Sequence, residues 1–233
     1  MMPLRILVID DNPSDRVLVI RELQRYFDQP QIREIYSSGD LTRAIAQGEF
    51  DAVVTDFQLR WTTGIDILQL VKSRYPRCPI VMFTNTGTEE IAVEAMKIGL
   101  DDYILKIPSR YARVPIALET AIDRTKAQLQ AELQEIRFRN LLDRLKIGVF
   151  RIDLDGKLLE ANAALLRLLG ANSIEQAESF LPGATLINPG EVQQEITLQT
   201  ADGSSIAVSI STVISQIENI LAIDGLVELV DRV

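Results

Sequence analysis

Residues 4–13 read LRILVIDDNP, and residues 51–56 read DAVVTD. Each stretch is a short aliphatic run that ends in aspartate, at Asp10 and Asp11 in the first and at Asp56 in the second. A continuous apolar run of this length is typical of a strand buried on both faces of a parallel sheet. The two stretches therefore predict two interior strands, each with a carboxylate at its end.

Helical patterns alternate with such strands along the first half of the chain. Strands are predicted over residues 4–9, 32–36, 51–56, 79–83 and 103–105. Helices are predicted to begin at Pro13, to follow Asp40 as a cap, and to cover residues 65–71 and 88–97, with Gly99 as a stop signal. Strands and helices that alternate with short links imply an α/β fold, in which helices cover both faces of a parallel sheet.

Polar residues stand at the carboxyl ends of four of these strands: Asp10 with Asp11, Asp56, Thr84 and Lys106. Functional groups collect at that edge of a parallel sheet. Three converging carboxylates need a cation to offset their repulsion, and Mg²⁺ prefers oxygen ligands. Asp56 would be a nucleophile toward a phosphoryl group, whose charge Lys106 and Mg²⁺ would neutralise. Each residue alone is more often a cap, a turn former or a solvated side chain, and only their combination at these strand ends indicates such a site.

Residues 1–125 resemble a response regulator receiver domain. The resemblance is carried by DD at 10–11, VVTD ending at Asp56, MFT ending at Thr84, GLDDY at 99–103 and Lys106. It implies a flavodoxin-like, doubly wound sheet of five parallel strands in the order 2-1-3-4-5. Two positions depart from the common pattern. FQLRWTTG follows Asp56 where many receivers carry Met-Pro, and IPS follows Lys106, which leaves the usual cis peptide bond after the lysine without its proline.

The same resemblance implies a role for each site residue. Asp56 would be the phosphoacceptor, assisted by Lys106 and Thr84, and Thr84 with Tyr103 would form a switch pair whose hydroxyl and ring move on phosphorylation. The Mg²⁺ ion would have as protein ligands Asp10, Asp11, Asp56 and the backbone carbonyl of Gln58. Tyr103 is as readily explained by plain packing.

From residue 113 the composition changes. Residues 113–145 contain no glycine and only one proline, Pro115, and they are rich in strong helix formers. The apolar positions of this predicted helix lie three, four or seven residues apart: Leu118, Ile122, Leu129, Leu133 and Ile136. We expect part of the helix to project as a linker whose apolar stripe supports dimerisation. Packing against either neighbouring domain is the alternative.

Residues 137–233 resemble a PAS domain, an α+β fold with an antiparallel sheet. The resemblance is carried by FRNLLDRLKIGVFRIDLDGKLLEANAALLRLLG, by DGS at 202–204 and by IDGLVELVDRV at the end, and is poor over 171–192. The order expected is a hairpin with a DLDG turn, a helix capped by Asn162, a loop over 181–190 and three strands. The short middle segment implies a small cavity or none, and we expect no cofactor here.

Composition narrows the classes of function. The chain has 233 residues, a net charge of −9, a single cysteine and no histidine. The negative net charge argues against nucleic-acid binding. A single cysteine, Cys78, suits the reducing cytoplasm. The sequence also has no apolar stretch long enough for a membrane segment. Without histidine, any phosphoryl group on Asp56 must come from another molecule, and the resemblance implies a histidine kinase or phosphotransfer protein in trans. We expect a receiver domain at 1–112, a helical linker at 113–146 and a PAS-like domain at 147–233.

These observations favour a two-component response regulator that signals through conformational or dimerisation change, and not an enzyme. No Ser-His-Asp triad can form without histidine, and the sequence has no GxxxxGK[ST] nucleotide loop. Two alternatives stay open. The chain could be the N-terminal part of a larger hybrid sensor kinase or cyclase, or a dimeric scaffold that is never phosphorylated.

Overall fold

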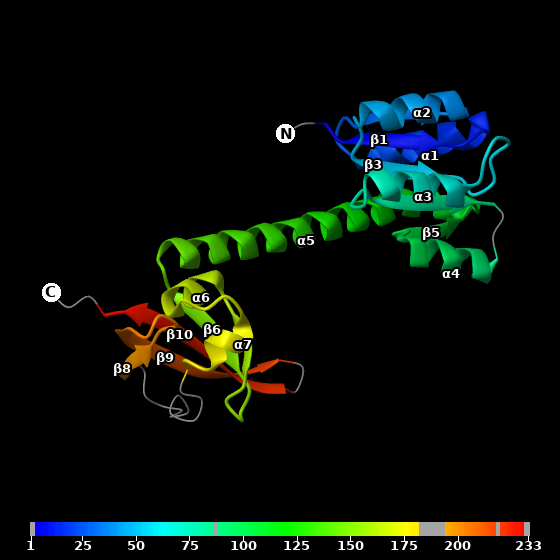
Figure 1. Cartoon of the computed structure of the whole chain (residues 1–233). Coiled ribbons are helices and arrows are strands. Elements are labelled where there is room, and N and C mark those ends of the chain that lie inside the picture. The colour runs from blue at the N-terminus through cyan, green and yellow to red at the C-terminus, as the bar shows by residue number, and fades with distance from the viewer. Residues whose placement is uncertain (1–2, 86–87, 182–193, 218–219, 231–233) are drawn as a thin grey trace. The chain divides into compact units, whose positions relative to one another are not determined.

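The computed structural model has two compact units, Met1–Ala131 and Glu132–Val233. It describes residues 3–85, 88–181, 194–217 and 220–230. The division between the units falls within the longest helix, α5 (Arg113–Arg144), which Figure 1 shows in green.

Unit 1 is a five-stranded parallel sheet with helices on both faces (Figure 1). In chain order its elements are β1 (Arg5–Ile9), α1 (Pro13–Tyr26), β2 (Gln31–Ile35), α2 (Ser38–Gln47), β3 (Ala52–Thr55), α3 (Gly64–Arg74), β4 (Ile80–Thr84), α4 (Glu89–Ile98), β5 (Asp102–Leu105), a 3₁₀ turn (Pro108–Arg110) and the first part of α5. The strand order is β2-β1-β3-β4-β5. The fold class and strand order predicted from the sequence are confirmed.

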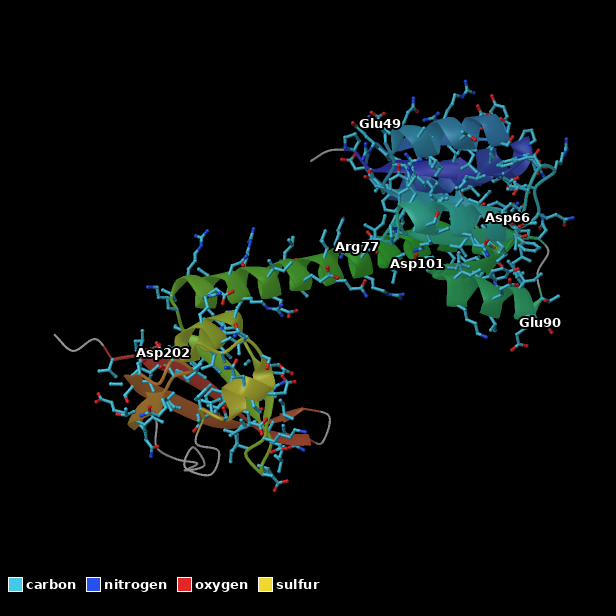
Figure 2. The ribbon with its side chains drawn as sticks, viewed as in Figure 1. Glu49, Asp66, Arg77, Glu90, Asp101 and Asp202 are labelled. Carbon is cyan, nitrogen blue, oxygen red and sulfur yellow. The ribbon has the colours of Figure 1, made fainter. Side chains whose placement is uncertain are left out.

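Side chains at the helix ends fix where the helices begin. The prediction that Asp40 caps α2 is wrong: the cap is Ser37, whose hydroxyl accepts a hydrogen bond from the backbone N–H of Asp40. Asp40 instead lies in the first turn, where a carboxylate suits the positive end of the helix dipole. At α3, Thr63 and Asp66 (labelled in Figure 2) form a reciprocal capping box. This capping box fixes where the loop after β3 ends and α3 begins.

The core of unit 1 has two layers, one on each face of the sheet. Leu7 and Ile9 of β1 pack into a cluster with residues of α2, α3 and α4, whereas Ile6 and Val8 pack into another with α1 and α5. Alternation of this kind follows from the two-residue period of a strand. Because both faces are covered, the interior strands β1, β3 and β4 are apolar along their length, and polar residues appear only at their ends. The edge strand β2 differs, since Arg33 and Glu34 lie within it.

Strand register brings those ends together. Ile9 is opposite Thr55, so Asp10 and Asp56 each follow one of two paired residues. The N–H of Asp56 donates to the carbonyl of Ile9 at 2.8 Å, so the β1–β3 ladder continues one residue beyond the strands. On the other side, the N–H of Lys106 donates to the carbonyl of Thr84 at 2.7 Å. The backbone thus fixes all four strand ends at one edge.

Unit 2 has a five-stranded antiparallel sheet in the order β7-β6-β10-β9-β8. Its elements after α5 are β6 (Gly148–Ile152), β7 (Leu158–Ala161), α6 (Ala163–Leu169), α7 (Ile174–Glu178), β8 (Gln194–Gln199), β9 (Ser205–Ile217) and β10 (Ile220–Leu229). The predicted α+β class and antiparallel sheet are confirmed. The sequence did not predict α7, and most of the loop expected over 181–190 lies outside the described residues.

The core of unit 2 forms between one face of this sheet and α6 and α7. Phe150, which is 1% exposed, lies directly over Gly225 of the neighbouring β10. A Cβ atom at Gly225 would stand 2.1 Å from Cζ of that ring, so only glycine leaves room for it. Asn162 caps α6 as predicted, and its side-chain oxygen also accepts the N–H of Val149 at 2.9 Å.

The apolar stripe of α5 divides into a buried and an exposed part. Leu118 and Ile122 are buried in the core of unit 1, whereas Leu129, Leu133 and Ile136 are 40%, 46% and 55% exposed. Nothing among the described residues covers the later part of the stripe. Among all residues that the structure describes, no helix is both long and apolar enough to cross a bilayer.

Candidate functional site

The ammonium group of Lys106 stands at the centre of the carboxyl edge of unit 1. Its Nζ lies 2.6 Å from Oδ2 of Asp10, 2.6 Å from Oδ2 of Asp56 and 3.1 Å from Oδ2 of Asp15. A lysine ammonium has three N–H donors, so each donor has one carboxylate. The structure therefore brings together Asp10, Asp56 and Lys106, as the sequence predicts.

Burial makes this cluster electrostatically strong. The Lys106 side chain is 1% exposed and that of Asp10 is 5% exposed. Burial alone would lower the pKa of Lys106, but its hydrogen bonds to Asp10 and Asp56 outweigh that cost and raise the pKa above that of an ordinary lysine. Burial also raises the pKa of Asp10, against the opposing hydrogen bond and charge of Lys106. Lys106 is thus a permanent cation beside the Asp56 carboxylate.

Asp11 lies beside the same cluster but has a different partner. Its Oδ2 accepts the backbone N–H of Arg60 at 3.0 Å and lies 3.2 Å from Nε of that residue. Arg60 belongs to the loop that follows Asp56, and so does Gln58, whose N–H lies 3.3 Å from Oδ1 of Asp56. The two predicted metal-binding segments, residues 10–11 and 56–58, therefore approach each other.

The donor set fits a hard divalent cation. Four carboxylates, those of Asp10, Asp11, Asp15 and Asp56, face two cations, Lys106 and Arg60, which leaves two negative charges uncompensated. Among the described residues, no three acidic or cysteine side chains form a ready-made metal cage. Mg²⁺ needs no such cage, because it is commonly held by one or two carboxylates and several waters.

Because Gly64 has no side chain, it leaves room for the backbone of Asp56 and Phe57. A Cβ atom at Gly64 would stand 2.6 Å from the carbonyl oxygen of Asp56 and 2.8 Å from Cα of Phe57. The N–H of Gly64 donates to the carbonyl of Phe57 at 2.7 Å, which closes the loop between β3 and α3. The start of α3 is thus pressed against the backbone of Asp56.

The predicted switch residues lie at neighbouring strand positions. Thr84 ends β4 and is fully buried, opposite Leu105 in the β4–β5 register. Tyr103 of β5 is partly buried against the cluster that contains Met82. Burial, and then the charge of Asp56, raise the pKa of the Tyr103 hydroxyl. The peptide bond after Lys106 is trans, as are all others among the described residues.

Sequence reasoning missed two residues of this cluster, Asp15 and Tyr111. Asp15 lies in the first turn of α1, and its place could have been read from the sequence, because a helix that starts directly after Asp11 must begin at the same edge. The hydroxyl of Tyr111 donates to Oδ1 of Asp15 at 3.1 Å. No sequence signal indicates this contact, since it depends on the 3₁₀ turn after Lys106.

Comparison with protein families agrees with this geometry. Residues 6–113 match the family model for the response regulator receiver domain, and residues 136–201 match that for the PAS domain. Both domains predicted by resemblance are therefore confirmed.

Curated relatives are similar to the N-terminal part of the chain. A putative response regulator NtrX-like protein of Rickettsia conorii is 30% identical over 166 residues, which are 70% of this chain and 34% of the relative. The response regulator protein PilR of Pseudomonas aeruginosa is 31% identical over 117 residues, which are 50% of this chain and 25% of the relative. The chain thus spans about a third or less of the length of these relatives.

Solved structures show the same fold for unit 1. NtrX from Brucella abortus matches with a TM-score of 0.51 and 29% identity, over 60% of this chain and 30% of that one. The signal receiver domain of a putative LuxO repressor protein from Vibrio parahaemolyticus matches with a TM-score of 0.51 and 19% identity, over 56% of this chain and 98% of that one. From its strand order, its carboxyl-edge cluster and these matches, the chain carries a response regulator receiver domain followed by a PAS domain.

Proposed function

We propose that this chain is a two-component response regulator in which Asp56 accepts a phosphoryl group from a partner protein. The observation that carries the proposal is the position of Lys106 Nζ, 2.6 Å from a carboxylate oxygen of both Asp10 and Asp56. A buried cation held against a nucleophilic carboxylate suits phosphoryl transfer, in which charge on the phosphoryl oxygens must be neutralised.

The proposed reaction is a simple displacement. An oxygen of Asp56 attacks the phosphorus of a phosphohistidine on the partner, a P–O bond forms, and the P–N bond breaks as the partner's imidazole leaves. Lys106 donates to the phosphoryl group, and Thr84 supplies a hydroxyl. Asp10, Asp11, Asp56 and the carbonyl of Gln58 would hold Mg²⁺, which supplies further positive charge at the phosphoryl oxygens.

The proposed output is a shift between two conformations. Movement of the Thr84 hydroxyl toward the phosphate, with inward rotation of Tyr103, would alter the surface next to β5 and α5. The sequence connects α5 directly to the PAS domain, and the exposed residues Leu129, Leu133 and Ile136 suit self-association into a homodimer. We propose no enzymatic activity of its own and action in the cytoplasm, without nucleic-acid or membrane binding.

One alternative has a specific observation in its favour. Because the chain spans a third or less of the curated relatives it matches, its receiver domain could serve a longer protein with further domains. A scaffold that is never phosphorylated is less well supported, since the cluster around Asp56 retains every charged group that the chemistry needs.

Phosphorylation of the purified chain tests the proposal. Wild type and Asp56→Asn are incubated with Mg²⁺ and a small acyl phosphate donor, and intact mass and elution volume are measured. A phosphate mass on wild type alone, with a change in elution, is the expected result. Absence of phosphate on both proteins would support the scaffold, and phosphate without a change in elution would contradict the dimerisation output.

A further inference from the structure

We infer that Asp15 is a positioning residue for Lys106, and that Tyr111 holds Asp15 in place; the inference rests on the proposed function. Oδ2 of Asp15 lies 3.1 Å from Lys106 Nζ, and Oδ1 accepts the hydroxyl of Tyr111 at 3.1 Å. The two oxygens of this carboxylate thus join the Lys106 ammonium at the centre of the site to the Tyr111 hydroxyl.

Asp15 differs from the other two partners of Lys106 in what happens to it during the reaction. Asp56 forms an acyl phosphate with the phosphoryl group, and Asp10 is a proposed metal ligand, so both take on another bond. Asp15 has neither role. Of the three carboxylates that contact Lys106 among the described residues, Asp15 is therefore the one that stays available throughout. It can hold the ammonium in place while the other two N–H donors turn to the phosphoryl oxygens.

The surroundings of Asp15 suit this role. Its side chain is 14% exposed, so the ion pair with Lys106 is screened far less than a surface pair. The amide of Asn12, the cap of α1, donates to Oδ2 of Asp15 at 3.1 Å, the oxygen that Lys106 also contacts, whereas Tyr111 binds Oδ1. Asp15 therefore accepts from three donors, Asn12, Lys106 and Tyr111. Together they restrain its carboxylate from rotating away from Lys106.

Tyr111 is itself held firmly. Its ring packs edge-to-face on Phe83, with 4.8 Å between the ring centroids, and its carbonyl accepts the N–H of Val114 in the first turn of α5. Burial, followed by the neighbouring charge and hydrogen bond of Asp15, raises the pKa of the Tyr111 hydroxyl. The hydroxyl is therefore a donor at neutral pH, and it connects the start of α5 to the lysine of the site.

The test compares three variants of the full chain. Asp15→Asn removes the charge and keeps the shape, and Tyr111→Phe removes only the hydroxyl and keeps the ring on Phe83. Asp51→Asn is the matched control, since Asp51 is also paired with a cation, Arg5, but lies at the opposite end of β3. The rate of phosphorylation is measured at saturating Mg²⁺ over a range of concentrations of a small acyl phosphate donor. This series gives the maximal rate and the donor concentration at half-maximal rate. Nitrogen-15 spectra of the lysine ammonium groups are recorded without Mg²⁺.

Asp15→Asn is expected to lower the maximal rate by about tenfold, less than the ~10²- to 10³-fold cost of removing a transition-state donor itself. The donor concentration at half-maximal rate should not change, because Asp15 does not touch the donor. Tyr111→Phe should act in the same direction but less, both variants should shift the Lys106 ammonium signal, and Asp51→Asn should do neither.

The outcomes separate this inference from the proposed function. A wild type that takes phosphate and an Asp15→Asn variant that takes it equally fast or faster would overturn the positioning role alone. The same conclusion follows if the Lys106 signal does not move in Asp15→Asn. A wild type that takes no phosphate would instead overturn the proposed function, and the role of Asp15 with it.

Discussion

Replacing Gly64 with alanine should destabilise the receiver domain and displace the backbone of Asp56. The added Cβ would stand 2.6 Å from the carbonyl oxygen of Asp56, 2.8 Å from Cα of Phe57 and 2.9 Å from Cε of Met82. The methionine can rotate away, but the first two atoms belong to the backbone and must shift. Overpacking costs ~1 to 3 kcal/mol, and a backbone clash places this variant near ~3 kcal/mol.

The assay is urea unfolding of the full chain, followed by tryptophan fluorescence. Trp61 is the only tryptophan, and it packs against the core of unit 1, so its signal reports that unit alone. With a urea dependence of ~1 to 3 kcal/mol per molar, a loss of ~3 kcal/mol lowers the midpoint by roughly 1 to 3 M. The variant should also accept phosphate more slowly, because the clash lies at the acceptor residue.

A matched control separates the clash from the general effect of changing a glycine. In α2, a Cβ at Gly39 would meet nothing closer than Oγ of Ser37, at 3.9 Å. Gly39→Ala should therefore be neutral or stabilise unit 1 by up to ~1 kcal/mol, since alanine is the better helix former. If Gly64→Ala unfolds at the same urea concentration as Gly39→Ala, the reasoning about close approach at Asp56 is refuted.

Three further outcomes are expected elsewhere in the chain. Gly225→Ala should lower the thermal transition of unit 2 and leave the tryptophan transition of unit 1 unchanged, because its Cβ meets the buried ring of Phe150; equal shifts in both would contradict this. Cys78 should resist thiol reagents until urea unfolds the chain, since burial raises its pKa to about 12, and rapid labelling of the folded protein would show that view to be mistaken. Hydrogen bonds from Thr200 and Ser204 lower the pKa of Asp202 to about 2, so its stabilising effect is present above the ordinary pKa of 3.8 and is lost as pH falls toward 2. Thr200→Val should move the NMR titration midpoint of Asp202 upward, and an unchanged midpoint would remove Thr200 as the cause.

The predictable part of the site is the part that parallel-sheet geometry dictates. Asp10 and Asp56 each follow a buried apolar strand, and Lys106 follows the edge strand β5. Register alone places the ends of such parallel strands at one edge. Their convergence needs no knowledge of loops or side-chain rotamers. For that reason the acid–lysine cluster agrees with what the sequence indicates, whereas the strand order was implied by the resemblance to receiver domains.

The parts that the sequence did not predict depend on local geometry. Ser37 and Asp40 are both good capping residues three positions apart, and composition does not show which one is the cap and which lies in the first turn. The helix α7 has only five residues, Ile174–Glu178, too few to show a helical period. The contact between Tyr111 and Asp15 depends on the path of a 3₁₀ turn, which no repeating pattern encodes.

The proposed function requires above all that Asp56 carry the phosphoryl group. The most direct measurement is to phosphorylate the chain with Mg²⁺ and a small acyl phosphate donor, reduce it with borohydride, and sequence its peptides by mass spectrometry. Borohydride converts an aspartyl phosphate to homoserine, so the modified position is marked permanently. The account predicts homoserine at position 56 and none when the donor is omitted. Homoserine at another aspartate, or unmodified Asp56 throughout, would contradict it.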